Sequence, residues 1–368
     1  MLSRRAITRP MGRQLALVDR FPALVSLPRL PFVEVPTPVE RLRLPGLPDG
    51  TLWVKRDDQS CPLYGGNKPR KLEFVIGAAA ARGSRRLVTT GGIGTHHGLA
   101  TTLLARSQGI ATTIAVVPQP VTDHVREQLR AMWACGAEIV PARGIGSAAA
   151  QVMRVLARSA LRGERPSFVP TGGSSAVGDI GFVSAAFELA DQIEAGVLPE
   201  PREVYVPVGS GGTLSGLVLG ARLAGLRVRF VGVLVTDILP PSPARLARLA
   251  AATLRRLRQV APSLPAVSVG AEDFPLAHRQ LGAGYGAPTP AAHAAQEAAR
   301  AAGLQLETVY TAKCLSELLE RWREGRAEAP LLFWHTYSSV DFWRAAPAVP
   351  GRGELPAALQ RMLGEAAS

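Results

Sequence analysis

Cysteine, aromatic residues and long apolar runs are all scarce in this sequence of 368 residues. The three cysteines, Cys61, Cys135 and Cys314, lie far apart and form no CxxC pair, which excludes a disulfide scaffold or a zinc ribbon and suits a reducing compartment. No apolar run approaches the roughly 18 residues of a membrane-spanning helix. With 47% hydrophobic residues, the chain is predicted to be a soluble cytoplasmic protein with a sizeable core and no membrane partner.

Lysine is rare too, although the chain is strongly basic. Of 42 basic residues, only four are lysines: Lys55, Lys68, Lys71 and Lys313. Arginine replaces lysine well on a surface, but it keeps its proton and cannot serve as an amine nucleophile. The positions that retain lysine are therefore the first places to look for amine chemistry.

The net charge of +13 is one signature of nucleic-acid binding. The charges are scattered, however, and the cluster of Arg255, Arg256 and Arg258 is short and lacks interleaved aromatics. We therefore expect solvated arginine faces and no nucleic-acid partner. A basic nucleic-acid binder is the alternative from another class, and it would show steep salt dependence and no cofactor absorbance.

The order of apolar segments predicts an α/β architecture. Residues 1–50 are punctuated by proline and are expected to form an irregular arm, whose Arg-rich opening leaves an organelle-import signal as an alternative. Short apolar runs then alternate with amphipathic ones, as in mainly parallel sheets. The expected strands are Leu52–Lys55, Arg86–Thr89, Thr112–Val117, Glu138–Val140, Val204–Val206, Val228–Leu234 and Leu331–Trp334. The expected helices are Pro69–Ala81, His97–Ser107, Asp123–Ala134, Ser147–Leu161, Asp179–Ile193, Thr213–Leu223, Pro243–Leu257, Pro290–Ala302 and Ala312–Arg323.

The first of three glycine-containing loops holds Lys68 and reads YGGNKPRK over residues 64–71. Its glycines allow close backbone approach, and Pro69 at the first helical position would place Lys68 at the start of a helix. The positive helix end lowers the pKa of an amine and favours the neutral form that Schiff-base chemistry requires. A solvated lysine is the alternative, and the scarcity of lysine weighs against it.

The second loop, VGSGGT over residues 208–213, lies between a predicted strand and a predicted helix. Its N–H groups and the helix N-terminus would form a phosphate cradle. Leu214 occupies the third glycine position of a dinucleotide fingerprint, and the loop lacks the lysine of a P-loop. A single phosphate on a small cofactor fits better than a pyrophosphate, and a plain tight turn is the alternative.

The third loop, TGGIGTHHG over residues 90–98, also precedes a predicted helix. Its small residues and the Thr95 hydroxyl suit a substrate carboxylate. The adjacent His96 and His97 point apart and lack a third ligand at metal spacing, so we expect no metal; hydrogen-bonding or capping histidines are the alternative. Together the three loops describe an enzyme of pyridoxal 5'-phosphate (PLP), which acts as an electron sink.

Eight collinear segments carry a resemblance to a known family: VKRDD, GGNKPRKLEF, LVTTGGIGTHH, PTGGSSAVGDIGFVSAAFEL, VPVGSGGTLSGL, GAGYGAPT, VYTAKCLSELL and LLFWHT. From about Leu27 to about Trp334, the chain resembles the D-cysteine desulfhydrase / 1-aminocyclopropane-1-carboxylate (ACC) deaminase family of PLP enzymes. The resemblance implies the tryptophan-synthase-β-like fold (fold type II), with two three-layer α/β domains and mainly parallel sheets. A small domain would span residues 72–178 and a large one 1–71 and 179–368, with PLP in the cleft and a homodimer as the assembly.

The resemblance also implies roles for matching residues. Lys68 would bind the cofactor covalently, Lys71 would contact its phosphate, Tyr285 would carry a proton near the substrate, and Thr336 would hydrogen-bond the pyridine nitrogen. The phosphate loop would comprise Gly209, Ser210, Gly211, Gly212 and Thr213. The residues implied at the substrate are Thr95, His96, His97, Tyr285 and Tyr337, with Thr95 also catalytic and His96 also on the cofactor.

Several positions depart from the family pattern. Where the family reads GGIQSNHARQ, this chain reads GGIGTHHGLA: Thr95 replaces a serine, and His96 replaces the asparagine that contacts the phenolic oxygen of the cofactor. Tyr337 replaces the first glycine of HTGG. Thr311 stands where the cyclopropane deaminases carry a glutamate, which would hold the pyridine nitrogen protonated. This last change favours simple elimination over ring opening.

The predicted function is a PLP-dependent lyase that carries out α,β-elimination on a small amino acid. The substrate amine would displace Lys68, its carboxylate would bind the loop at residues 95–97, and Lys68 or Tyr285 would remove the α-proton. A D-cysteine-like substrate would give pyruvate, ammonia and sulfide. The alternatives are β-replacement or elimination on a larger amino acid, and a PLP-binding protein without turnover.

Overall fold

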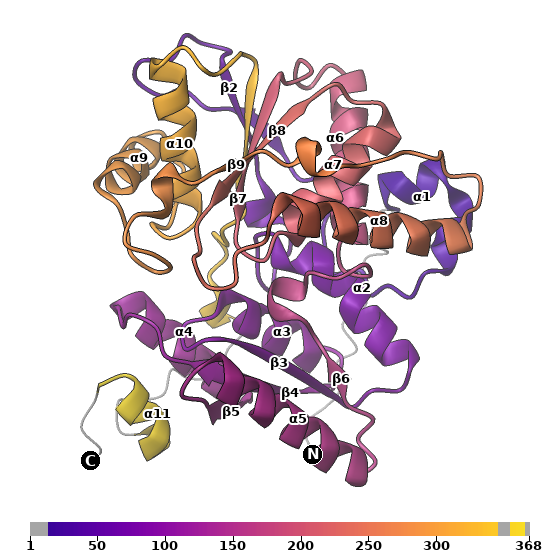
Figure 1. Cartoon of the computed structure of the whole chain (residues 1–368), viewed down its shortest axis with the longest axis vertical. Coiled ribbons are helices and arrows are strands. Elements are labelled where there is room, and N and C mark those ends of the chain that lie inside the picture. The colour runs from indigo at the N-terminus through magenta and orange to yellow at the C-terminus, as the bar shows by residue number, and fades with distance from the viewer. Residues whose placement is uncertain (1–13, 345–353, 365–368) are drawn as a thin grey trace.

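The computed structural model describes residues 14–344 and 354–364, and its strands form two separate sheets (Figure 1). The strands are β1 Val39–Arg41, β2 Leu52–Lys55, β3 Arg86–Gly92, β4 Ala111–Val117, β5 Glu138–Pro141, β6 Ser167–Phe168, β7 Glu203–Val208, β8 Arg229–Leu234, β9 Leu276–Ala277 and β10 Leu331–Trp334. The helices are α1 Ala16–Arg20, α2 Lys68–Ala81, α3 His96–Arg106, α4 Asp123–Ala134, α5 Ile145–Leu161, α6 Ile180–Glu194, α7 Gly212–Ala224, α8 Pro243–Val260, α9 Pro290–Ala301, α10 Thr311–Arg323 and α11 Ala357–Met362. None of these helices is long and apolar enough to cross a bilayer.

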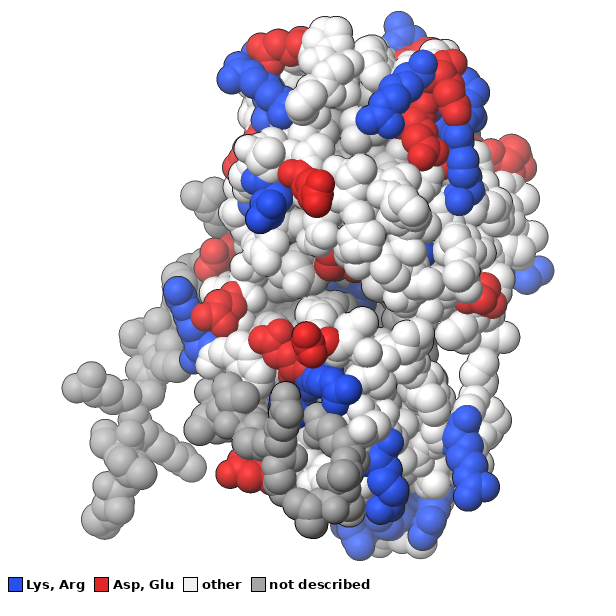
Figure 2. All heavy atoms as spheres, turned by 90° about the vertical axis from the view of Figure 1, so that its left-hand side faces the viewer, with Lys and Arg blue, Asp and Glu red and all other residues white. Residues whose placement is uncertain are grey.

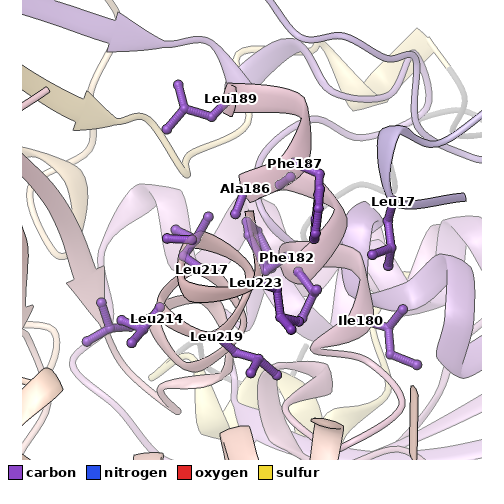
Figure 3. Close-up of a cluster of buried hydrophobic side chains, with 14 of the residues drawn as sticks. Leu17, Ile180, Phe182, Ala186, Phe187, Leu189, Leu214, Leu217, Leu219 and Leu223 are labelled. Carbon is purple, nitrogen blue, oxygen red and sulfur yellow. The ribbon is translucent and has the colours of Figure 1, made fainter. Parts of the chain in front are cut away.

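The larger sheet has the order β1-β2-β10-β7-β8-β9, and its neighbouring strands are parallel except for β1 and β2. Helices α1, α6, α7 and α8 pack on one face, and α9 and α10 pack on the other (Figure 1). Figure 3 shows part of the first core, where Phe182 and Phe187 of α6 lie beside Leu217 and Leu223 of α7. Two covered faces make this unit a three-layer α/β structure.

The smaller sheet has the order β5-β4-β3-β6 with all pairs parallel. Leu87 and Ile114 pack with α2, α3 and α4, whereas their neighbours Val88 and Ala115 pack with α5. The two cores differ because successive side chains of a strand point to opposite faces. The sheet is therefore covered on both sides, and the predicted fold class, two three-layer α/β units with mainly parallel sheets, is confirmed.

The N-terminal arm is more regular than expected. Its described part contains α1 and the short strand β1, which pairs antiparallel with β2; proline-rich flanks and a length of three residues hide this strand from pattern analysis. Helix α2 begins at Lys68 and not at Pro69, so the proline takes the second position. Residues 1–13, which carry most of the Arg-rich opening, lie outside the described residues.

The C-terminal helix α11 packs against the smaller sheet. Leu355, Leu359 and Leu363 are buried in the core that α2, α3 and α4 share, whereas the sequence assigned residues 179–368 to the larger domain. After β10 of the larger sheet, the chain therefore returns to the smaller sheet, where α11 packs. The division at residues 72 and 178 stays a prediction.

A buried network of charges fixes helix α2 to the larger sheet. Arg70 of α2 donates to both oxygens of Asp57, at 2.7 and 2.9 Å, and to Glu188 of α6 at 2.9 Å. Lys55 of β2 donates to the same Glu188 at 2.5 Å, and Trp334 of β10 donates to Asp57 at 2.8 Å. Burial alone would raise the pKa of Glu188, but Arg70 and Lys55 outweigh burial and lower it to about 2, so this carboxylate stays charged.

Removing Glu188 should destabilise the fold strongly. Glu188→Ala leaves Arg70 and Lys55 buried without their shared carboxylate, which costs about 3–5 kcal/mol in comparable buried pairs. Glu194→Ala is the matched control, because Glu194 pairs with Arg20 on the surface and such pairs contribute less than about 1 kcal/mol. Urea unfolding of both variants measures the difference, and equal losses of unfolding free energy would contradict this account of the network.

Candidate cofactor and substrate site

The predicted site residues lie in loops that follow parallel strands, where α/β folds bind their ligands. Asn67 joins two of these loops to its own, because its side-chain amide donates to Thr213 Oγ1 at 3.0 Å and its backbone N–H donates to the Thr336 carbonyl at 3.2 Å. The third loop also lies near Lys68, because the charge of Lys68 contributes to lowering the pKa values of His96 and His97. Figure 2 shows the surface hollowed between the upper and lower parts of the molecule.

Lys68 is a half-buried amine at the start of α2. Its Nζ donates to Asn67 Oδ1 at 2.7 Å. Burial and the neighbouring Lys71 together lower the pKa of Lys68 to about 7, although Glu307 opposes the shift. A large fraction of Lys68 is therefore neutral near pH 7, which is the state that an amine nucleophile needs.

Ser174 connects Lys71 to the glycine loop. The Lys71 amine donates to Ser174 Oγ at 3.3 Å, the Gly212 N–H donates to the same oxygen at 3.1 Å, and Ser210 Oγ lies 2.8 Å from it. The Lys71 amine and the glycine loop thus meet at the Ser174 hydroxyl. Ser174 lies in the PTGGSS segment of the resemblance, but the sequence analysis gave it no role.

The loop before α7 has the shape and charge of a phosphate cradle. Gly211 has φ +90°, and a Cβ on Gly212 would lie 2.4 Å from Ser174 Oγ and from Asp179 Oδ1, so neither position tolerates a side chain. The loop presents serine hydroxyls, the Lys71 amine and the positive end of a 13-residue helix. These groups fit the phosphate of PLP, and Lys68 supplies the amine for its aldehyde.

Thr95 and His97 belong to the start of α3. Thr95 Oγ1 accepts a backbone N–H and caps the helix. His97 is buried, and its Nε2 lies 3.0 Å from Thr89 Oγ1, whose own proton goes to the Val169 carbonyl at 2.8 Å. His97 Nε2 must therefore donate, which leaves Nδ1 as an acceptor without a partner among the described residues. Burial, aided by two nearby lysines, lowers the pKa of His97 well below its usual value.

His96 points away from His97 and into a polar aromatic cluster. Its Nδ1 lies 2.6 Å from Tyr64 Oη and its Nε2 lies 3.0 Å from His124 Nε2. The Tyr337 ring is edge-on, with centroids 5.6 Å apart. Burial, His124 and Lys68 lower the pKa of His96 well below its usual value, so the ring is neutral. No group of three possible metal ligands occurs within residues 14–344 and 354–364.

Tyr285 is linked to the glycine loop through Tyr310. Tyr310 Oη donates to Tyr285 Oη at 3.0 Å, and a Cβ on Gly209 would lie 3.2 Å from the Tyr310 ring. The Tyr285 N–H donates to Asp237 at 2.9 Å, which fixes its loop. Burial raises the pKa of Tyr285 despite the hydrogen bond from Tyr310, so the phenol keeps its proton near neutral pH.

The structure brings the predicted residues of all three loops into one region, while the role of each stays a prediction. The contacts involve further residues to which the sequence analysis gave no role: Tyr64, Asn67, Ser174, His124, Glu307 and Tyr310. Asn67 and Ser174 lie inside segments of the resemblance, which is a usable signal. His124 stands alone at the start of α4, and nothing in its sequence neighbourhood indicates that it meets His96.

Known proteins resemble this chain over most of its length. The nocardicin C-9' epimerase of Nocardia uniformis subsp. tsuyamanensis is 34% identical over 332 residues, which cover 88% of this chain and 97% of that protein. The D-cysteine desulfhydrase of Salmonella typhimurium is 31% identical over 335 residues, or 89% and 98% of the two chains.

Solved structures share the fold. An ACC deaminase homologue has a TM-score of 0.73 and 26% identity, covering 86% of this chain and 93% of its own. The threonine deaminase isoform 2 of Solanum lycopersicum, in its processed form, has a TM-score of 0.57 and 12% identity over 97% of this chain and 91% of its own, which shows the fold alone.

Ser174 offers a test of the phosphate cradle. Ser174→Ala removes the hydroxyl shared by Lys71, Ser210 and Gly212 and should weaken PLP binding by about tenfold or more, because a hydrogen bond to a charged group contributes about 1.5–3 kcal/mol. Absorbance titration of cofactor-free protein with PLP measures the affinity. Ser107→Ala, at the far end of α3, should bind PLP like the wild type. Unchanged affinity in Ser174→Ala would refute the cradle.

The chain can be assigned to a family because one family model matches most of its length. The family model of the "Pyridoxal-phosphate dependent enzyme" matches residues 30–336, a range that includes Lys68, the glycine loop and Thr336. The fit of the lysine amine and the phosphate cradle agrees with this match. The chain belongs to the PLP-dependent enzymes, in the group of the ACC deaminases and D-cysteine desulfhydrases, and PLP is its cofactor.

Proposed function

We propose that this enzyme is a lyase that removes the α-proton and then the β-substituent of a small amino acid, as a D-cysteine desulfhydrase does. The observation that carries the proposal is the amine of Lys68, whose pKa is lowered to about 7 beside a phosphate cradle. An amino acid with a β-thiol would give pyruvate, ammonia and sulfide. The relatives named D-cysteine desulfhydrase support this substrate class.

Each residue of the site has a task in this reaction. PLP, when bound, supplies the electron sink that makes the α-proton removable. Lys68 would hold the removed proton at Nζ, since an amine with a pKa near 7 both accepts and releases a proton at neutral pH. Tyr285, kept protonated by burial, would give a proton to the leaving group. The start of α3 at residues 95–97 would bind the substrate carboxylate through the N–H groups of His96 and His97, since the Thr95 N–H donates to the Gly92 carbonyl.

The environment of Thr311 favours elimination over ring opening. Thr311 occupies the position of a glutamate in the cyclopropane deaminases, and its hydroxyl bonds to the Glu307 carboxylate at 3.0 Å. Glu307 also accepts hydrogen bonds from the backbone N–H groups of Val309, Tyr310 and Thr311. Its carboxylate oxygens are therefore engaged by donors of its own loop. Thr336 and Thr311 each carry a neutral hydroxyl. A hydroxyl does not stabilise a protonated pyridine nitrogen in the way that a negatively charged carboxylate does.

Turnover of D-cysteine tests the proposal directly. The purified holoenzyme should release pyruvate and sulfide from D-cysteine. Lys68→Ala should lose both the activity and the absorbance band between about 410 and 430 nm that borohydride fixes. Lys313→Arg is the matched control, because it keeps a donor for the Leu281 carbonyl and should retain the band. A holoenzyme with the band but without product from any amino acid would support the alternative of a PLP-binding protein.

The pKa of Lys68 predicts the pH dependence of cofactor attachment. Because burial lowers this pKa to about 7, the amine is protonated and unreactive below pH 7 and neutral above it. The rate of covalent PLP attachment to cofactor-free protein should therefore rise with pH and level off above about pH 8. Stopped-flow absorbance between about pH 5.5 and about 9 measures this profile. A midpoint near 10 would show an ordinary lysine and contradict the assignment.

A second candidate reaction returns the α-proton without loss of the β-substituent. Two observations favour it: the 34% identical relative is named an epimerase, and the hydrogen-bonded pair of His96 and His124 adds a second proton-carrying group near Lys68. Chiral analysis of the amino acid left after incubation separates the two reactions. Elimination consumes the substrate, whereas epimerisation converts it to the amino acid of opposite configuration at the α-carbon.

The organisation of the enzyme follows from the same proposal. The small domain, residues 72–178, would close over the bound amino acid and exclude water. A Cβ on Gly286, next to Tyr285, would lie 3.6 Å from Pro120 on the β4–α4 loop; segments of the two sheets thus approach each other there, which supports such closure. A cytoplasmic homodimer completes the proposal, and light scattering of the purified protein measures its oligomeric state.

A further inference from the structure

Tyr64, His96 and His124 form a continuous chain of hydrogen bonds at the edge of the site. The Tyr64 hydroxyl lies 2.6 Å from His96 Nδ1, and His96 Nε2 lies 3.0 Å from His124 Nε2. The imidazole rings are tilted against each other, with centroids 4.9 Å apart and an interplanar angle of 32°. His96 therefore uses both ring nitrogens, one toward each partner.

This geometry permits two arrangements of the same protons. In the first, Tyr64 donates to His96 Nδ1 and His96 Nε2–H donates to His124 Nε2. In the second, His96 Nδ1–H donates to Tyr64 and His124 Nε2–H donates to His96. The first arrangement becomes the second when one proton enters at Tyr64 Oη and another leaves from His124 Nδ1, so each residue of the chain gains one proton and loses one. Two short contacts between groups that can each donate and accept a proton are the condition for a proton relay.

The ends of the chain differ in their surroundings. Tyr64 is buried, with 2% of its surface exposed, and it lies four residues before Lys68 in the same loop. His124 lies at the start of α4 and is half-buried. The rings of Tyr337 and Phe342 cover the chain, with Tyr337 against His96 and Phe342 against Tyr64. Lys68 is close enough to His96 to act on it electrostatically, so the path leads from the neighbourhood of Lys68 toward the partly accessible end of α4.

We propose that Tyr64, His96 and His124 form a relay that carries the substrate's α-proton between the site at Lys68 and water. Outward, the Lys68 ammonium gives its proton to Tyr64 Oη, Tyr64 gives its own to His96 Nδ1, His96 Nε2–H passes to His124 Nε2, and His124 Nδ1–H passes to water. Lys68 loses one proton, water gains one, and each relay residue gains one and loses one. The inference rests on the proposed function only in that an α-proton has to be moved.

The relay deepens the proposed function because it determines the fate of the α-proton. Without it, Lys68 keeps the proton it has removed and can return the same one. With the relay, the removed proton exchanges with water while the substrate is bound. Asparagine, which the resembling family carries at the position of His96, can donate and accept hydrogen bonds but cannot pass a proton through its side chain. The pair of histidines therefore gives this chain an exchange path that an asparagine does not provide.

Exchange of the α-hydrogen in heavy water measures the relay. Alanine lacks a β-leaving group, so the holoenzyme can only exchange its α-hydrogen for deuterium, which proton NMR follows for both enantiomers. The variants are His124→Asn and His96→Asn, which keep a hydrogen-bonding side chain, and His293→Asn on the exposed surface of α9 is the matched control. The PLP absorbance of every variant is recorded, so that loss of cofactor is seen separately.

The expected result is that His124→Asn exchanges at least about tenfold more slowly than the wild type at unchanged PLP absorbance, while His293→Asn exchanges normally. His96→Asn should slow to the same extent when its rate is expressed per bound PLP. In His124→Ala, added imidazole should restore part of the rate, which a merely structural histidine would not allow. Exchange at the wild-type rate in His124→Asn would overturn the relay, and so would a wild-type holoenzyme that exchanges neither enantiomer.

A second measurement does not use the cofactor. In cofactor-free protein with ¹⁵N-labelled histidine, the Nδ1 and Nε2 signals of His96 should lie between those of a protonated and a bare nitrogen, because two tautomers interconvert. His124→Asn should restore one fixed tautomer. A single fixed tautomer in the wild type would contradict the relay. Failure to eliminate sulfide from D-cysteine would refute the proposed lyase and leave both of these results intact.

Discussion

The buried ion network around Arg70 determines where the reactive lysines lie. Arg70 occupies the third position of α2, between Lys68 and Lys71, and Asp57 and Glu188 hold its guanidinium inside the larger part of the molecule. A guanidinium keeps its charge at any relevant pH, so this attachment does not depend on the state of the site. Lys68 and Lys71 can thus have lowered pKa values while the helix that carries them stays fixed.

The close packing of α6 against α7 has a similar effect on the phosphate cradle. A Cβ on Gly216 would lie 2.6 Å from the Asp179 carbonyl, and one on Gly220 would lie 2.6 Å from the Val183 carbonyl. The absence of side chains at these positions lets the two helices approach. Their starts then lie close enough for Ser174, just before α6, to contact the first residue of α7. Burial raises the pKa of Asp179 at this junction above its usual value, although Lys71 opposes the shift, and this reduces the negative charge near a bound phosphate.

Much of this protein is predictable from sequence because its chemistry lies in short loops with strong local patterns. The strand Leu52–Lys55 and the helix Asp123–Ala134 have the predicted bounds, since apolar periodicity and an N-cap threonine mark them. The antiparallel strand β1 was not predicted, because three residues between prolines carry no periodicity.

Contacts between distant segments were the harder part of the prediction. The pairing of His96 with His124 joins the start of α3 to the start of α4, and no local pattern encodes it. Ser174 was missed for a different reason: its segment was recognised, but its hydrogen bonds depend on how α6 and α7 pack. Pattern analysis locates the loops of such a site, whereas packing decides which side chains meet.

The burial of the lysines leaves the protein with an unusual chemical surface. Lys55, Lys71 and Lys313 are each at most 1% exposed, and Lys68 faces the site. Reagents that acylate amines therefore find one accessible lysine side chain, at the reactive centre. Coupling of the cofactor-free protein through its lysines would modify the site, so its immobilisation and labelling call for arginine- or tag-directed chemistry.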